Sequence, residues 1–247
     1  MQAGGSDMIT VLAGGVGAAK FLQGLVEVVD PQELIIVGNT GDDIDLHGLH
    51  ISPDLDIVTY TLAGLHHADQ GWGIHGDTFH ALEMLGRYGH ATWFNLGDYD
   101  LATHLHRSDR LRHGWPLSAI TDEIRRALNV VPRILPMTDQ RAETKIVTDE
   151  GVLHFQEYLV QRRTEPAVRG VVYEGIEVAR PAPGVCEAIQ KADGIIIPPS
   201  NPIVSIGTIL AVPGVLQALA ARRGRVVAVS PIVQGATLKG PADKLMV

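Results

Sequence analysis

The sequence has little of several features that define common classes of protein. A single cysteine, Cys186, among 247 residues excludes an internal disulfide and a cysteine-cluster metal site; we interpret it as a buried helix residue. No apolar run approaches the roughly 20 residues that a membrane-spanning helix needs. The N-terminus lacks the basic start and apolar stretch of a signal peptide. These absences predict a cytoplasmic protein.

Basic residues are also scarce. The chain has 20 Lys and Arg against 28 Asp and Glu, which gives a net charge of −8, and the basic residues form no run. A nucleic-acid-binding surface normally shows a basic stripe, so this class of protein is disfavoured. An acidic protein can still bind a phosphorylated small molecule if backbone amides or a metal ion offset the charge.

What the sequence does contain is a regular alternation of short apolar strands with amphipathic helices. Uniformly apolar strands that alternate with helices predict an α/β, doubly wound, mostly parallel Rossmann-like sheet. The strands are expected over residues 9–12, 34–37, 92–96, 171–173, 194–197 and 225–229. The helices are expected over residues 18–29, 77–88, 101–113, 118–128, 184–191 and 212–221, with another that begins at 52–54.

The middle of the chain differs from this pattern. Two apolar segments flank the turn Asp149-Glu150-Gly151, which is typical of an antiparallel hairpin. We therefore expect a small antiparallel insertion over 137–168. The segments 8–136 and 169–247 are expected to form one nucleotide-binding core, and residues 1–7 a disordered extension.

A glycine-rich turn, "AGGVGAAK" at 13–20, follows the first expected strand. Glycines at such a turn let backbone N–H groups approach a phosphate at a helix N-terminus. The stretch fits neither familiar template. A P-loop needs Ser or Thr after its lysine, where this chain has Phe21, and a dinucleotide turn needs a third glycine where it has Lys20. Taken alone, the turn leaves phosphate binding and a plain tight turn equally open.

Loops rich in Gly, Pro, Asn, Asp and Ser follow the expected strands. The ends of the strands at the opposite edge of the sheet are ordinary. Ligands of open α/β sheets bind outside the carboxyl ends of the strands, so this asymmetry favours a phosphate site. The loops in question cover residues 13–17, 38–43, 97–100, 198–202 and 230–231.

Aspartates gather after the second expected strand. Asp54 is accounted for as a helix-capping residue, whereas Asp42 directly after Gly41 is less well explained by capping or by solvation. A bare carboxylate facing a diphosphate would repel it by roughly 4 kcal/mol at an effective dielectric of about 20. Mg²⁺ removes that repulsion and uses one or two carboxylates together with phosphate oxygens. Asp42 with Asp56 is therefore a candidate metal pair, beside the plain reading as a solvated loop.

Other side chains give weaker evidence about catalysis and phosphate binding. No serine sits in a GxSxG turn and no Cys/His pair is evident, so covalent catalysis has little support. Four cations are candidates to neutralise phosphate charge, namely Arg141, Lys145, Lys239 and Lys244.

At this point the motifs resemble those of the 2-phospho-L-lactate transferase family. The resemblance runs from Met8 to the end of the chain and includes "VGNTGDDIDLHGLHISPDLDIVTYTLAG", "GWGIHGDTFHALEMLGRYG" and "PPSNPIVSIGTILAVPGV". It implies transfer of a phospholactyl-type group from a guanosine diphosphate conjugate to 8-hydroxy-5-deazariboflavin (Fo), with release of GMP. The product would be a precursor of coenzyme F(420).

The resemblance also implies roles for single residues. Asp42 and Asp56 would hold Mg²⁺, and one of the two would take the proton of the attacking ribityl hydroxyl. Trp72, Asp98 and His104 would lie near the deazaflavin or its ribityl chain. The guanosine and phosphates would be surrounded by Gly14, Gly15, Gly17, Asn39, Ser200, Asn201 and Pro202.

The resemblance further implies a homodimer and a longer chain. Family members continue beyond the position of Val247, so we expect this chain to lack their C-terminal part. Two other functions stay open as alternatives: a non-catalytic regulatory protein of the same superfamily that binds a nucleotide sugar, and, less favoured, an NAD(P)-dependent oxidoreductase. The sequence does not separate phospholactate, phosphoenolpyruvate and phosphoglycerate as the transferred acid, nor Mg²⁺ from other divalent ions.

Overall fold

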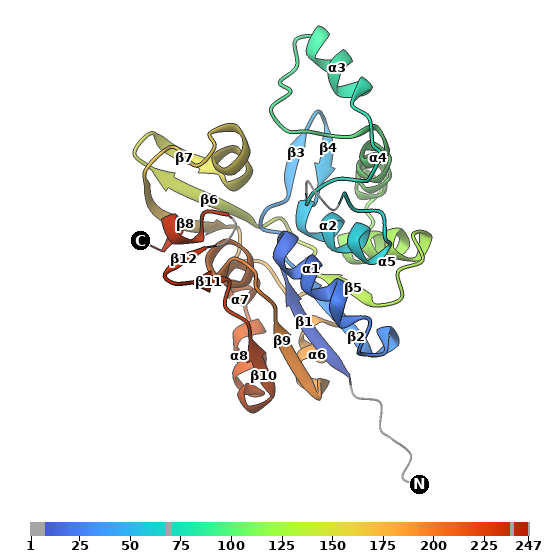
Figure 1. Cartoon of the computed structure of the whole chain (residues 1–247), viewed down its shortest axis with the longest axis vertical. Coiled ribbons are helices and arrows are strands. Elements are labelled where there is room, and N and C mark those ends of the chain that lie inside the picture. The colour runs from blue at the N-terminus through green and yellow to red at the C-terminus, as the bar shows by residue number, and fades with distance from the viewer. Residues whose placement is uncertain (1–7, 68–70, 238–239, 247) are drawn as a thin grey trace.

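A five-stranded parallel sheet forms the centre of the molecule, with strand order β10-β9-β1-β2-β5 (Figure 1). The computed structural model describes residues 8–67, 71–237 and 240–246, and the expected extension over 1–7 lies outside them. The strand order reverses between β1 and β9, which confirms the predicted α/β, doubly wound architecture. The strands are β1 (Ile9–Ala13), β2 (Leu34–Gly38), β5 (Arg133–Pro136), β9 (Gly194–Ile197) and β10 (Val226–Ala228).

Helices cover both faces of this sheet. Successive side chains of a strand point to opposite faces, so Val11 and Ile36 pack against one helical layer while Leu12 and Val37 pack against the other. This is why the strands are apolar throughout. The first layer contains α1 (Gly15–Leu25), α2 (Pro53–Leu62) and α5 (Leu117–Ala127), and the second contains α6 (Val185–Lys191), α7 (Thr208–Ala211) and α8 (Val215–Ala220).

Two arms rise above the carboxyl edge of the sheet (Figure 1). One arm is helical and carries a short hairpin at its base; the other is a three-stranded antiparallel sheet of order β7-β6-β8. The helical arm contains β3 (Ile44–Leu46), β4 (Leu49–Ile51), α3 (His80–Arg87) and α4 (Asp98–Arg112). The antiparallel arm contains β6 (Glu143–Thr148), β7 (Gly151–His154), β8 (Val168–Glu174) and the π-helical turn Glu157–Gln161.

The strand expected over 92–96 is wrong, because this segment is an irregular loop that leads into α4. Leu96 is 1% exposed and packs with Ile44 and Ile51 of the β3–β4 hairpin, and Trp93 and Phe94 pack against the same cluster. The apolar run therefore buries its side chains without pairing to a strand. Periodicity alone does not separate these two outcomes.

The strand expected over 171–173 does form, within β8, but it pairs antiparallel with β6 rather than joining the parallel sheet. Its residues are all intermediate or exposed, and none is fully buried, which suits a sheet with one open face. The hairpin at Asp149-Glu150-Gly151 is confirmed as the β6–β7 connection. The division into 8–136, 137–168 and 169–247 stays a prediction.

The remaining elements are short. A second π-helical turn, Pro202–Gly207, precedes α7, and 3-10 turns occupy Pro31–Glu33 and Arg223–Arg225. The last described segment contains the β11–β12 pair (Ile232–Val233, Ala236–Thr237) and α9 (Ala242–Leu245). Within the part of the chain that the structure describes, no helix is long and apolar enough to cross a membrane.

Candidate active site at the carboxyl edge of the sheet

The glycine turn after β1 opens directly into helix α1, which begins at Gly15 rather than at the expected Ala18. Gly15 has a φ of +67°, a left-handed conformation that glycine adopts without strain. A Cβ at Gly17 would lie 2.1 Å from the carbonyl oxygen of Pro199, so only glycine lets the two loops meet. The Gly14 N–H donates to Ser200 Oγ at 3.3 Å. The turn thus presents a helix N-terminus at the point where the strand order reverses.

Asn39 joins three loops at this edge. Its side-chain amide donates to Asp54 Oδ2 at 2.9 Å and to the Val204 carbonyl at 3.2 Å, while its Oδ1 accepts the Gly41 N–H at 2.9 Å. The Gly15 N–H also donates to the Asp54 carboxylate. The first turn of α2 is thereby fixed against the turn after β1 and the loop after β9.

Asp42 lies buried beside Asp54. Burial raises the pKa of Asp42 well above its ordinary value, and the nearby Asp54 charge raises it further. Burial raises the pKa of Asp54 as well. Asp42 Oδ1 is buried and finds no hydrogen-bond partner within the described residues. Two like charges in a buried site with an unused oxygen are an arrangement that a cation would stabilise.

Asp56, the partner that the sequence suggested for Asp42, lies in a different environment. Arg107, whose side chain is 2% exposed, binds both Asp56 oxygens, with Nη1 to Oδ2 at 3.0 Å. His104 Nδ1 is 3.7 Å from the same Oδ2, and His104 Nε2 is 3.3 Å from Asp100 Oδ1. Asp56, Asp100 and His104 place ligand atoms within 4.8 Å of one another, but Arg107 already supplies a positive charge there.

His104 is 1% exposed and belongs to this buried group. Its Nδ1 lies 3.3 Å from Arg107 Nη1, and Tyr60 donates to Asp100 at 2.7 Å. These contacts fasten α4 to α2. The contact with a deazaflavin that the resemblance implies for His104 stays a prediction.

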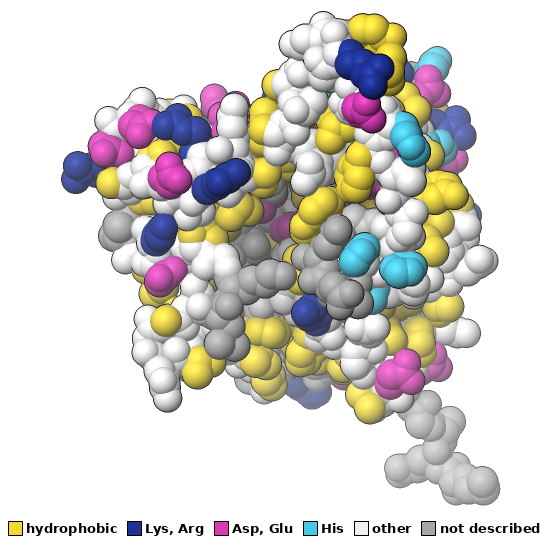
Figure 2. Space-filling view, turned by 45° about the horizontal axis from the view of Figure 1, so that its top comes forward, with side chains coloured by type: hydrophobic (Ala, Val, Ile, Leu, Met, Phe, Trp, Pro, Cys, Tyr) yellow, Lys and Arg dark blue, Asp and Glu magenta, His cyan; other side chains and the backbone are white. Residues whose placement is uncertain are grey.

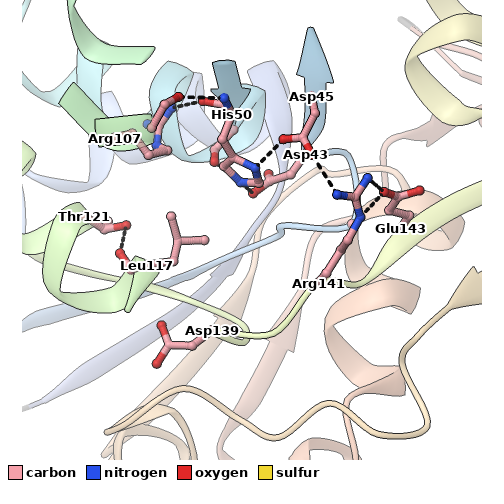
Figure 3. Close-up of polar contacts among 12 residues, drawn as sticks. Asp43, Asp45, His50, Arg107, Leu117, Thr121, Asp139, Arg141 and Glu143 are labelled. Atoms are coloured by element: carbon pink, nitrogen blue, oxygen red, sulfur yellow. Dashed lines mark hydrogen bonds and ion pairs between the residues drawn. The ribbon is translucent and has the colours of Figure 1, made fainter. Parts of the chain in front are cut away.

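A polar network extends from Asp43 toward the antiparallel arm (Figure 3). His50 bridges two carboxylates, with Nε2 3.0 Å from Asp43 and Nδ1 2.9 Å from Asp45. Arg141 continues the chain by binding Asp45 at 2.6 Å and Glu143. Burial raises the pKa of Asp43, although the His50 contact opposes that shift. Alternating charges therefore connect the loop after β2 with the start of β6.

Trp72 lies apart from these groups, in the helical arm. With Phe79 and Gly97 it lines a cavity of about 100 Å³, and the Trp72 and Phe79 rings are 6.5 Å apart. Asp98 begins α4 and accepts hydrogen bonds from Thr78 Oγ1 at 2.6 Å and from the Ala81 N–H at 2.9 Å. The Thr78 hydroxyl and the backbone N–H groups of Ala81 and His80 lower the pKa of Asp98 to about 2.

The structure brings together Gly14, Gly15, Gly17, Asn39, Asp42 and Ser200. Asn201 adjoins them, because its Oδ1 accepts the N–H groups of Ile203 and Val204 and starts the turn at Pro202. The other candidate cations lie elsewhere: Lys145 pairs with Glu143, Lys244 binds Thr164, and Lys239 lies outside the described residues. Figure 2 looks onto this edge and shows a hollow between the two arms.

Sequence reasoning missed two residues of the site. Asp54 was explained as a helix cap, but it reaches across to the β1 turn. Arg107 lies 51 positions from Asp56 in the sequence, so no local spacing announces their pairing. A weak signal existed for Arg107, since it stands one helical turn after His104 on the same face of α4.

Comparison with known proteins gives consistent matches over nearly the whole chain. The family model described as 2-phospho-L-lactate transferase CofD matches residues 9–247. A phosphoenolpyruvate transferase of Kitasatospora aureofaciens is 49% identical over 244 residues, which is 96% of this chain and 76% of that relative. A protein of the same name from Streptomyces coelicolor is 49% identical over 243 residues, with the same shares of the two chains.

A solved structure shares the fold. Protein BH3568 from Bacillus halodurans superposes with a TM-score of 0.60 at 19% identity, over 91% of this chain and 68% of that one. A second structure of that protein, described as a member of the UPF0052 family, gives a TM-score of 0.59 at 18% identity, over 87% of this chain and 66% of that one. The family match and the relatives near half identity decide the assignment: this chain belongs to the 2-phospho-L-lactate transferase family.

Proposed function

We propose that the protein transfers a phosphorylated three-carbon acid, as phosphoenolpyruvate or a phospholactyl equivalent, from a guanosine diphosphate conjugate to Fo. GMP is released, and the product is a precursor of coenzyme F(420). Relatives named phosphoenolpyruvate transferases, at 49% identity over 96% of the chain, favour phosphoenolpyruvate as the acid. The observation that carries the proposal is the buried carboxylate pair Asp42 and Asp54 beside the glycine turn, which suits a metal-assisted diphosphate site.

The metal part of the proposal assigns Mg²⁺ to Asp42 and Asp54. The residues fit such an ion, because Asp42 Oδ1 is buried without a partner within the described residues and the nearby Asp54 charge raises the pKa of Asp42. Bound there, Mg²⁺ would neutralise the diphosphate of the donor. Asp56 remains the alternative ligand that the sequence suggested, but its bidentate contact with Arg107 assigns it more simply to holding α4.

The chemistry requires one bond to form and one to break. The terminal ribityl hydroxyl oxygen of Fo attacks the phosphorus that carries the acid, and the bond from that phosphorus to the oxygen bridging to GMP breaks. A carboxylate of the site, Asp42 or Asp56, takes the hydroxyl proton. The α1 N-terminus and the Ser200 loop hold the phosphates, so the protein contributes mainly position and charge neutralisation.

The acceptor is assigned to the cavity beside Trp72. An exposed indole and the Phe79 ring next to it offer flat apolar surface to a deazaflavin. Trp72→Ala should raise the KM for Fo at least about tenfold, since stacking on an aromatic side chain contributes about 1–3 kcal/mol per ring, with little change in the KM for the donor. Steady-state kinetics with each substrate varied in turn measure this; an equal rise in both constants contradicts the assignment.

The experiment that tests the function follows the mass of Fo. Purified protein with Mg²⁺ is incubated with Fo and, separately, with each guanosine diphosphate conjugate: phosphoenolpyruvyl, phospholactyl and phosphoglyceryl. A mass gain equal to one phosphorylated acid, with equimolar GMP, is expected first with the phosphoenolpyruvyl donor. Asp109→Asn, an exposed carboxylate of α4, serves as the matched control. Binding of a nucleotide sugar with no transfer from any donor would instead favour the regulatory alternative.

A further inference from the structure

The antiparallel arm holds the backbone on both sides of Asp42. The Thr144 N–H of β6 donates to the Gly41 carbonyl at 2.7 Å. The ring of His154, the last residue of β7, donates through Nε2 to the Asp43 carbonyl at 3.1 Å. The carbonyls of the two residues that flank Asp42 are therefore both bound by the arm, whose sheet is separate from the central one (Figure 1).

The contacts of the His154 ring determine where its proton lies. Nδ1 accepts the Gln156 N–H at 3.1 Å, and a carbonyl oxygen at Nε2 can only accept, so Nε2 carries the proton and the ring is neutral. Burial lowers the pKa of His154, and the Lys145 charge lowers it further. A neutral donor fixes the loop without adding a positive charge that would compete with a cation at Asp42.

The His154 side chain is itself rigidly held. It is 7% exposed, and its backbone N–H donates at 2.9 Å to Glu157 Oε2, at the start of the π-helical turn that follows β7. The ion pair between Arg141 and Asp45 also joins the arm to this part of the chain, but the Arg141 side chain is 68% exposed. Exposed ion pairs contribute little, so the buried ring contact is the stronger tether.

We propose that His154 is a positioning residue for the transfer reaction, because its Nε2–H fixes the loop that carries Asp42. The inference rests on the proposed function for the role of Asp42, whereas the contact itself does not depend on it. A Cβ at Gly41 would overlap the Thr208 methyl group, so the loop needs glycine there. Glycine leaves the backbone free to move, and the tether from His154 removes that freedom.

The first test is steady-state transfer to Fo by variants of His154. His154→Phe keeps the bulk of the ring but removes the donor, so kcat should fall at least about tenfold while the KM for Fo changes by less than about twofold. His154→Gln offers an amide N–H in place of Nε2–H and should keep kcat within about threefold of the wild type. His113→Phe, at an exposed position after α4, is the control and should leave both constants unchanged.

The second test is amide hydrogen exchange of the loop 39–43, which needs no substrate. Within this loop the Gly41 N–H donates to Asn39 Oδ1 and the Asp43 N–H donates to the Thr40 carbonyl. Loss of the tether should speed exchange of these amides severalfold, up to about tenfold, in His154→Phe. Exchange in strand β1 should stay as in the wild type, and His154→Gln should resemble the wild type throughout.

The outcomes separate this inference from the proposed function. A wild-type kcat or wild-type exchange over 39–43 in His154→Phe overturns the positioning role. An equal rise of exchange in β1 also overturns it, because that would mean a general loss of stability. If the wild-type protein transfers to Fo under those outcomes, the proposed function stands without this role for His154. If the wild type transfers nothing, the proposed function fails, and faster exchange in His154→Phe would still show that the ring holds the loop.

Discussion

Asp54 and Asp56 lie two residues apart in the first turn of α2 and are both buried. Their neighbouring side chains carry charges of opposite sign. Asp54 lies beside another carboxylate, Asp42, and its contacts are the Asn39 side-chain amide and the Gly15 N–H. Asp56 faces the guanidinium of Arg107 and is bound on both oxygens. Positions i and i+2 of a helix point to different sides, so one turn serves two sites.

The charge of the neighbouring side chain decides which of these buried acids is available for chemistry. A carboxylate paired with a buried arginine has its charge compensated, and removing either partner leaves the other stranded. A carboxylate next to a second carboxylate is uncompensated within the protein and gains from any cation that arrives. Burial alone does not distinguish these cases, whereas the identity of the neighbour does.

The largest effect is expected from breaking the compensated pair. Arg107→Met leaves the Asp56 charge buried without its partner, and the free energy of unfolding should fall by about 3–5 kcal/mol. Urea unfolding measures the loss. The double variant Asp56→Leu with Arg107→Met should recover most of it, and Arg126→Met, which removes an exposed pair with Asp122, should change it by less than about 1 kcal/mol. A small loss for Arg107→Met would show that Asp56 is not compensated in this way.

Removing the uncompensated carboxylate of Asp42 should lower the rate of turnover rather than the stability of the fold. Asp42→Asn keeps the shape but loses a ligand and proton acceptor, so the rate of transfer to Fo should fall by at least about 10²-fold. Circular dichroism should show an intact fold. Asp109→Asn is the control, and turnover of Asp42→Asn near that of the wild type would remove the metal proposal.

A smaller effect concerns stability without metal. Asp54→Asn relieves the repulsion with Asp42, so in EDTA the variant should be more stable than the wild type by about 1–2 kcal/mol, the equivalent of roughly one unit of pKa shift. Mg²⁺ should raise the melting temperature of the wild type but not that of the variant. Thermal unfolding with and without Mg²⁺ distinguishes this from a structural role, in which Asp54→Asn would be less stable in either buffer.

The smallest effect is expected in the pH dependence of the free energy of unfolding, measured in EDTA. Folded Asp42, Asp43 and Asp54 have pKa values above their ordinary 3.8, so the folded protein holds these protons more tightly than the unfolded chain does. Stability should therefore fall as pH rises above about 4 through the raised folded values, by on the order of 1 kcal/mol. The raised pKa of His50 acts in the same direction above 6.5. Asp54→Asn should show a shallower slope; an identical slope would mean that the pKa of Asp54 is not raised in the folded protein.

The central sheet could be predicted from the sequence because its strands are buried on both faces and so are apolar throughout. The same logic failed at 92–96, where Leu96 satisfies its burial against the β3–β4 hairpin without strand pairing. It also misplaced the segment 171–173, since neither apolar content nor length reveals which sheet a strand joins.

The candidate site was predictable in its location but not in its pairings. Loop composition placed Asn39, Asp42 and the glycine turn at one edge, and the structure brings them together. Which aspartate of "SPDLD" faces Asp42 depends on the rotation of α2, and that is set by tertiary packing rather than by local sequence. The pairing of Arg107 could not be predicted either, because its partner Asp56 lies 51 positions away in the sequence.

The contact between Gly14 and Ser200 joins residues 186 positions apart, and it has a consequence for how the protein is made. During synthesis β1 and β2 leave the ribosome early, but the crevice between β1 and β9 has only one wall until residues near 200 emerge. The nascent chain therefore carries its glycine turn unfinished until the loop after β9 has been made. A ligand that needs that crevice can act as a folding aid only after that loop has emerged.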